Sequence, residues 1–318
     1  MLTRRAACAA LLGALAAAAC TRKVEAPLPR VRVHATVSAR AAQVLAEAAR
    51  ARRLAEVVEA AGPGDAELLW LADPAELVAL GDRVADHGAP AAPGVPERFQ
   101  DPRRRFAPAC ARAAVLLVSP AAPFPVERLS DLADPRLAGR VAIPPFTDGE
   151  RTALVGALSA SAGEAAASRL LAGIARNRPV LAVSDEDVPA RIGRGEAWVG
   201  LASSEAAAAG AASAAGLEVV YPDQRDRGAV ILPTAVAPAR GSPPAALALA
   251  TWLASAEAEQ LLVARVPGLV PLRDGVPVPV GVRPAMALRV VALDWDLLAE
   301  KKREARAALE GWPERWAR

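Results

Sequence analysis

Apolar positions along the chain fall into short runs that alternate with longer segments of helical spacing. The short runs predict strands at residues 31–36, 66–72, 113–119, 141–143, 179–183, 197–202, 217–222 and 229–238. The segments between them predict helices that begin near Ser38, Asp73, Thr147, Ser161, Ser184, Ser203 or Ser204, and Asp294. Strands and helices that alternate in this way indicate an α/β fold with mixed, mostly parallel sheets and flanking helices.

The longest helix that this pattern predicts covers residues 38–61, and the sequence Gly-Pro-Gly directly after it ends the helix. Asp73 followed by Pro74 predicts another helix start, because Asp is a good N-cap and Pro suits the first helical position. Residues 86–108 are rich in Pro, Gly and Arg and predict a loop.

The first twenty residues differ in character from the rest. A pair of arginines precedes an apolar, uncharged stretch at residues 6–19, and small residues lead to Cys20. This pattern is typical of a secretory signal peptide at residues 1–19, followed by a tether at residues 20–29. Lipidation of Cys20 is one interpretation and simple cleavage before it is the other; Sec and twin-arginine export both stay open. The predicted location is the periplasm or the outer face of the cell membrane.

The composition narrows the class of protein. The 318 residues are enough for two domains, and with 53% hydrophobic but only 3% aromatic residues the core consists of Ala, Val and Leu. Without residues 1–19 the chain keeps 36 basic and 35 acidic side chains, a net charge of +1, which argues against nucleic acid as a partner. Basic runs such as residues 301–303 are therefore interpreted as solvated faces. Cys8 lies in the signal peptide and Cys20 at its end, so Cys110 is alone in the body of the mature protein, which excludes an internal disulfide and a cysteine metal cluster.

A hydroxyl or carboxyl side chain follows the end of several strands, in both halves of the chain. Ligands of open α/β sheets bind outside the carboxyl ends of the strands, where helix N-termini present free N–H groups. These side chains therefore predict a ligand cleft, although each of them has the alternative of a simple N-cap. The residues are Thr36, Ser38, Asp73, Thr147, Ser184, Ser203 and Ser204.

Two further side chains are candidates for the same cleft. His34 ends the first strand and either faces the cleft or packs as a structural histidine. Arg112 precedes the strand at residues 113–119 and either meets an anion in bidentate fashion or forms a structural ion pair. The other histidine, His87, is predicted to lie in a surface loop.

Three stretches, "LADPRLAGRVAI", "RGEAWVGLA" and "YPDQ", are the most specific signals in the chain. In their order and spacing between residues 31 and 279, they resemble the ferric-iron-binding type of the periplasmic solute-binding proteins of ABC importers. The resemblance implies a two-lobe, type II periplasmic-binding-protein fold with an interlobe cleft and two hinge strands. Lobe 1 is then expected at residues 30–112 and 235–318, and lobe 2 with the hinge strands at residues 113–234.

The chain departs from this family where the members bind iron. Members commonly use tyrosine phenolates just after the strand that corresponds to residues 197–202, and the positions here hold Ser203 and Ser204. The single tyrosine, Tyr221, lies in the "YPDQ" motif, which is not a ligand motif in the family. Neutral hydroxyls are poor donors for hard ferric ions, so neither a metal ligand set nor a cofactor is predicted. A small anion, a ferric complex bound through its chelator, or another polar solute remains as the ligand.

The predicted function is that of a monomeric extracytoplasmic solute-binding protein that delivers a small-molecule or chelated-metal ligand to an ABC permease. A degenerate binding protein that acts as a sensor or adaptor is the first alternative. A serine hydrolase with Ser203 as nucleophile and His34 as base is the second, but Ser203 does not lie in a Gly-x-Ser-x-Gly elbow. No catalytic residue is predicted.

Overall fold

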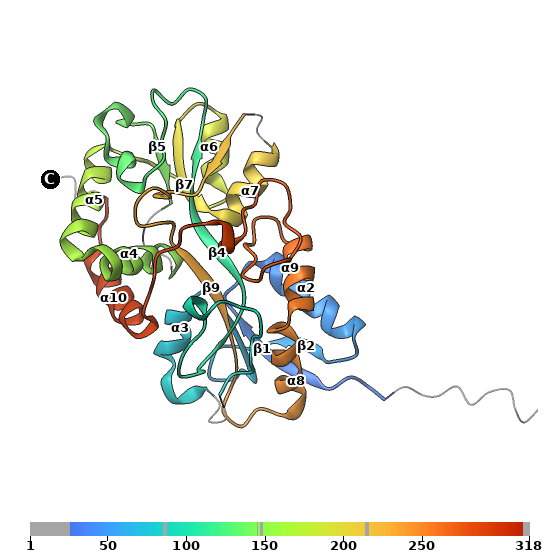
Figure 1. The fold of residues 1–318 in the computed structure, drawn as a ribbon. Coiled ribbons are helices and arrows are strands. Elements are labelled where there is room, and N and C mark those ends of the chain that lie inside the picture. Colours follow the sequence, from blue (N-terminus) through green and yellow to red (C-terminus); the bar gives the residue numbers. More distant parts are fainter. Residues whose placement is uncertain (1–25, 85–87, 145, 147–148, 214–215, 314–318) are drawn as a thin grey trace, which may run out of the picture.

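The computed structural model describes residues 26–84, 88–144, 146, 149–213 and 216–313, and these residues form two lobes (Figure 1). The first lobe, at the bottom of Figure 1, contains the N-terminal strands. The second lobe, at the top, contains the middle of the chain. The two lobes have different sheets, which share one long strand.

The first lobe is built on a sheet with the strand order β2-β1-β3-β9-β4. Strand β1 runs parallel to β2 and β3, whereas β9 runs antiparallel to β3 and β4. The strands are β1 (Arg30–Ala35), β2 (Glu56–Glu59), β3 (Leu68–Leu71), β4 (Ala107–Val118) and β9 (Ile231–Pro238). The helices of this lobe are α2 (Ala39–Ala51), α3 (Pro74–Ala79), α8 (Pro244–Leu253) and α9 (Ala256–Arg265).

The second lobe continues β4 into a sheet with the order β4-β7-β5-β6, and β8 also pairs with β4. Strand β5 runs parallel to β6 and β7, and β4 runs antiparallel to β7 and β8. The strands are β5 (Val141–Ile143), β6 (Val180–Leu181), β7 (Val199–Ser203) and β8 (Glu218–Val220). The helices are α4 (Gly149–Ala162), α5 (Glu164–Arg176), α6 (Asp187–Gly193) and α7 (Ser204–Ser213).

Strand β4 joins the lobes. Its residues up to Ala113 pair with β9 of the first lobe, and its residues from Ala114 onward pair with β7 of the second lobe. Figure 1 shows β4 and β9 side by side between the lobes, so a rotation of one lobe against the other has to bend this pair of strands. This arrangement is the two-lobe α/β fold that the sequence predicts.

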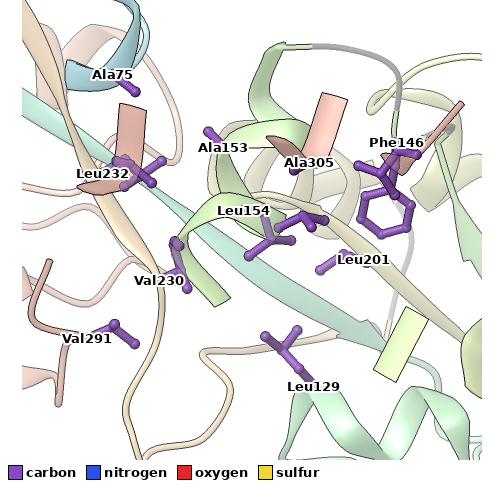
Figure 2. Close-up of a cluster of buried hydrophobic side chains, with 14 of the residues drawn as sticks. Ala75, Leu129, Phe146, Ala153, Leu154, Leu201, Val230, Leu232, Val291 and Ala305 are labelled. Atoms are coloured by element: carbon purple, nitrogen blue, oxygen red, sulfur yellow. The ribbon is translucent and has the colours of Figure 1, made fainter. Parts of the chain in front are cut away.

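The C-terminal helix α10 (Trp295–Ala308) packs against α4 of the second lobe and α3 of the first. One apolar cluster extends through both lobes, and Figure 2 shows residues that α3, α4, β7, β9 and α10 contribute to it. Helices α4 and α10 approach closely at Gly156, where a Cβ atom would lie 2.8 Å from the backbone nitrogen of Lys302. A side chain at position 156 would therefore push α10 away from α4.

The predicted helix over residues 38–61 is wrong in its second half. Helix α2 ends at Ala51, and Arg53 adopts a left-handed backbone with φ of 57°. Residues Glu56–Glu59 then form β2, which pairs in parallel with β1. The β-branched pair at Val57 and Val58 suits a strand, and hydrogen bonding to β1 outweighs the helical spacing of the apolar positions.

The predicted helix starts are confirmed where the side chain makes the N-cap bond. Ser38, Asp73 and Asp294 accept hydrogen bonds from backbone N–H groups in the first turns of α2, α3 and α10. Ser161 does not begin a helix, because it lies in the last turn of α4 and donates to the carbonyl of Ala157 at 2.7 Å. Helix α5 begins after Gly163 instead, whose φ of 85° suits glycine.

Ser184 does not cap a helix either. Helix α6 begins at Asp187, and the residue before it, Glu186, makes no side-chain cap bond. The carboxylate of Asp187 turns back and accepts a hydrogen bond from the Val183 N–H at 3.1 Å. The segment from Ser184 to Asp187 therefore forms a turn before α6, and Ser184 does not mark the start of a helix. Thr147 and Cys20 lie outside the described residues.

Asp223, in the "YPDQ" motif, destabilises the folded state at neutral pH, because its charged carboxylate is partly buried. Its φ is 59°, which Asn tolerates better than most residues, and burial raises the pKa of its carboxyl group to about 6. The folded pKa lies above the unfolded one, so the stabilisation from the protonated group is complete below about pH 4 and lost as the pH rises through about 6.

We expect Asp223→Asn to raise the free energy of unfolding by about 1–2 kcal/mol at about pH 8, after allowance for partial solvent exposure. The gain should shrink at about pH 4.5, where wild-type Asp223 is already mostly protonated in the folded state. Urea unfolding of both proteins at the two pH values measures the effect. An equal gain at both pH values would show that the charge of Asp223 has no part in it.

Candidate functional site

A cavity of about 830 Å³ lies between the lobes. The first lobe contributes the end of β1, the turn before α2, the end of β3 and the face of α3, and α10 contributes four residues. The second lobe contributes Gly149 at the start of α4 and Glu186 before α6. The polar lining consists of His34, Thr36, Ser38, Glu76, Arg112, Glu186, Lys302, Arg303 and Arg306.

The turn after β1 brings two predicted residues to the cavity wall. The Thr36 hydroxyl accepts a hydrogen bond from the Ala72 N–H at 2.8 Å and donates to Glu76 at 2.7 Å. The Thr36 hydroxyl therefore links the end of β3 to the carboxylate of Glu76 on α3. The Ser38 hydroxyl caps α2 and donates to the Glu205 carboxylate at 2.6 Å. Because Glu205 belongs to α7, this bond runs from the first lobe to the second.

Arg112 and Glu205 form an ion pair beside the hinge strand. Arg112 lies on β4, two residues before Ala114, where the pairing with the second lobe begins. Its guanidinium group contacts the carboxylate of Glu205, and both side chains are mostly buried. Of the two interpretations offered by the sequence, the structural ion pair is present, and it neutralises the charge that Arg112 brings to the cavity.

Asp73 lies behind the wall and caps α3. It is 2% exposed, and one carboxylate oxygen accepts a hydrogen bond from the Glu76 N–H at 3.2 Å. The other oxygen binds the Lys302 ammonium group of α10 at 2.7 Å, and Lys302 also contacts Glu76 at 3.3 Å. Burial raises the pKa of Asp73, and the positive charge of Lys302 opposes that rise. Lys302 thus connects α10 to the first lobe.

Ser203 and Ser204 are 1% and 2% exposed and are not among the residues that line the cavity. The Ser203 hydroxyl accepts a hydrogen bond from the Ala206 N–H at 3.2 Å, which makes Ser203 the N-cap of α7. The Ser204 hydroxyl accepts a hydrogen bond from the Ala113 N–H of β4 at 3.2 Å. Both hydroxyls therefore satisfy backbone groups inside the protein, and their contact with a ligand stays a prediction.

The remaining predicted residues are dispersed. His34 is half-buried and lines the cavity, whereas Ser184 lies in the turn before α6 and is not part of the lining. Tyr221 is 5% exposed, and its hydroxyl accepts a hydrogen bond from the Arg283 N–H at 3.3 Å, in a different cavity of the second lobe. Burial raises the pKa of Tyr221, which keeps the phenol neutral. This environment agrees with a structural role for the tyrosine.

Sequence reasoning missed the contribution of α10. Lys302, Arg303 and Arg306 line the cavity, although the basic run at residues 301–303 was interpreted as a solvated face. The one available signal was their spacing, which puts Arg303 and Arg306 on the same side of a helix. In the part of the chain that the structure describes, no three His, Cys, Asp or Glu side chains are grouped so that they could hold a metal ion.

Two lobes, a shared strand and a polar cleft between them define a binding protein that encloses a small molecule. The family model described as bacterial extracellular solute-binding protein matches residues 6–265. The chain therefore belongs to this family, which confirms the predicted class. A search of the curated proteins finds no significant match.

Solved structures share the fold. A Trichodesmium protein, FutA, in complex with iron and citrate has 17% identity and a TM-score of 0.74, with 89% of this chain and 99% of that chain covered. A Bordetella ferric binding protein has 23% identity and a TM-score of 0.71, with 88% and 98% covered. AfuA from Actinobacillus pleuropneumoniae, bound to fructose-6-phosphate, has 14% identity and a TM-score of 0.72, with 88% and 97% covered. At these identities the likeness establishes the fold alone.

The family is one of solute-binding proteins and not a class of enzymes, and its members work outside the cytoplasm. The serine hydrolase alternative finds no support, because the Ser203 hydroxyl is buried and accepts the bond from Ala206. The sensor alternative finds none in the family match either. No helix within the described ranges is long and apolar enough to cross a membrane.

Proposed function

We propose that this protein captures a solute for an ABC import system and holds it in the cleft between the lobes. The observation that carries the proposal is the cavity of about 830 Å³ at the carboxyl ends of β1 and β3, because this edge is where open α/β sheets bind ligands. The cavity is large enough for a small organic molecule. Bending of β4 and β9 would close the lobes on the ligand and present the closed form to a permease.

The similar structures bind iron with citrate, ferric ion, or a sugar phosphate, as their names state. This chain lacks a tyrosine in the cleft, and the buried hydroxyls of Ser203 and Ser204 do not replace phenolates. We therefore propose a solute that brings its own oxygen ligands or carries no metal at all. Lipidation at Cys20 would hold the protein at the membrane surface, beside the permease.

Ala79→Trp is expected to abolish solute binding. Ala79 is exposed at the end of α3 and lines the cavity, so an indole ring there fills part of the space that a solute needs. Stability should change by less than about 0.5 kcal/mol, because the position is at the surface. A ligand raises the melting temperature of a protein that binds it, so thermal shifts with ferric citrate, phosphate, carboxylates, sugar phosphates and polyols measure binding.

Ala165→Trp on the exposed side of α5 is the matched control and should keep the full thermal shift. A shift that survives in Ala79→Trp would place the binding site outside the cleft. If no solute in a wider panel stabilises the wild-type protein, the proposal of a solute-capture function is wrong.

A further inference from the structure

Helix α10 presents a basic face to the cleft that the proposed function leaves without a role. Lys302, Arg303 and Arg306 all line the cavity. Arg303 and Arg306 are three residues apart, so their side chains leave the helix on the same side. Cations are favoured near the C-terminus of any helix, but that effect does not require both guanidinium groups to face a cavity.

Ion pairs separate these cations into two groups. Lys302 binds the carboxylates of Asp73 and Glu76, and Arg112 binds Glu205, so both are neutralised within the protein. The side chains of Arg303 and Arg306 are exposed and line the cavity, and they form no ion pair or hydrogen bond with any other described residue. The cleft therefore contains two uncompensated guanidinium groups close to each other in the chain.

Across the cleft, the second lobe contributes one uncompensated carboxylate. Glu186 is exposed, precedes α6 without capping it, and has no partner within the described ranges. The lining thus combines two guanidinium groups on α10 with one carboxylate before α6. A ligand that matches both kinds of group carries negative charge and also has hydrogen-bond donors.

We infer that the cleft binds a small hydroxylated organic anion, whose phosphate or carboxylate group contacts Arg303 and Arg306 and whose hydroxyl groups donate to Glu186. Guanidinium groups bind both kinds of anion in bidentate fashion, and a carboxylate accepts hydrogen bonds from hydroxyls. A bare ferric ion does not suit this site, because two uncompensated guanidinium groups repel it. The inference rests on the proposed function and specifies its ligand class.

Isothermal titration of the full mature chain with inorganic phosphate, citrate, a hexose 6-phosphate and the uncharged hexose tests the inference. Citrate and the hexose phosphate represent the two sources of the anionic group, and the stronger binder identifies which one the site takes. We expect saturable binding of at least one of them, no binding of the hexose, and weaker binding as the salt concentration rises.

Arg303→Gln and Arg306→Gln should each weaken binding of that anion by about tenfold or more, the loss expected for a hydrogen bond to a charged group. Both positions are exposed, so the variants should fold. Arg169→Gln, an exposed arginine on α5 outside the cavity lining, makes the same charge change and should leave the affinity within about twofold. Glu186→Ala should weaken the hydroxylated anions but not inorganic phosphate.

Unchanged affinity in both arginine variants, or equal binding of the hexose and its phosphate, would overturn the inference. So would the absence of binding by every anion tested. The Ala79→Trp variant separates this failure from a failure of the proposed function. If a neutral solute binds wild type but not Ala79→Trp, the solute-capture function stands and only the inferred ligand class is wrong. If no solute of any kind binds in a way that depends on the cleft, the proposed function and the inference are both wrong.

Discussion

Glu259→Ala is expected to lower the free energy of unfolding by about 3–5 kcal/mol, because it leaves a buried guanidinium group without its counter-charge. Glu259 on α9 is 0% exposed, and its partner Arg273 is 4% exposed. One carboxylate oxygen of Glu259 binds the Arg273 guanidinium at 2.8 Å, and the other accepts a hydrogen bond from the Leu272 N–H at 2.5 Å. Chemical unfolding followed by tryptophan fluorescence measures the loss.

Glu257→Ala on the same helix is the matched control. Its partner Arg52 is at the surface, so this variant should lose less than about 1 kcal/mol. Replacing both Glu259 and Arg273 by methionine should cost less than the sum of the two single replacements by at least about 1 kcal/mol, since no unpaired charge remains. Additive losses would mean that the two side chains stabilise the lobe independently.

The ion pair of Glu259 and Arg273 matters for the cleft because it holds the loop after α9 in place. Arg273 also donates to the carbonyls of Ala254 at 2.6 Å and Pro93 at 2.8 Å, so it fastens the loop after α9 from three sides. The same loop binds β4 through the Ala111 N–H and the carbonyl of Val270 at 2.9 Å. At Gly268 the loop lies so close to the start of α7 that a Cβ atom would be 2.1 Å from the Ser204 carbonyl oxygen. The buried pair therefore supports the hinge strand from behind.

Most elements of the fold could be predicted from local patterns. Apolar runs identified the strands of both sheets, and side chains such as Asp73 and Ser203 marked helix starts that the structure confirms. The failures have a common cause, because a local pattern does not show what a distant or preceding segment does. Residues 56–59 have helical spacing of apolar positions, yet they form a strand because they pair with β1. A capping motif likewise carries no information on whether the chain is already helical before it, as at Ser161.

The sequence placed several first-lobe residues near the cavity that the structure contains. His34, Thr36, Ser38 and Arg112 line this cavity, Asp73 lies directly behind its wall, and their contact with a ligand stays a prediction. The other half depends on α10, which is far from these residues in the sequence and reaches them only because it packs on α3 and α4. A run of charged residues has the same sequence pattern whether it faces solvent or a cleft. The run at residues 301–303 therefore did not indicate that it lies beside the cavity.

Lys302→Met is expected to destabilise the protein by about 3–5 kcal/mol at about pH 8, because the buried carboxyl group of Asp73 then lacks its ammonium partner. Burial already raises the pKa of Asp73, and removal of Lys302 raises it further. A raised carboxyl pKa means that the penalty is present above that pKa and is relieved as the carboxyl group takes up a proton. The loss should therefore shrink as the pH falls, which unfolding curves at about pH 8 and about pH 5 would show.

Two variants identify the cause of this loss. Lys301→Met removes the neighbouring lysine, which binds the exposed Glu164 of α5 at 2.5 Å, and should cost less than about 1 kcal/mol at either pH. Asp73→Asn combined with Lys302→Met should recover most of the stability, since asparagine keeps the oxygen that caps α3 and carries no charge. If the double variant is as unstable as Lys302→Met at about pH 8, the loss comes from the packing of α10 on α3 and not from the stranded carboxylate.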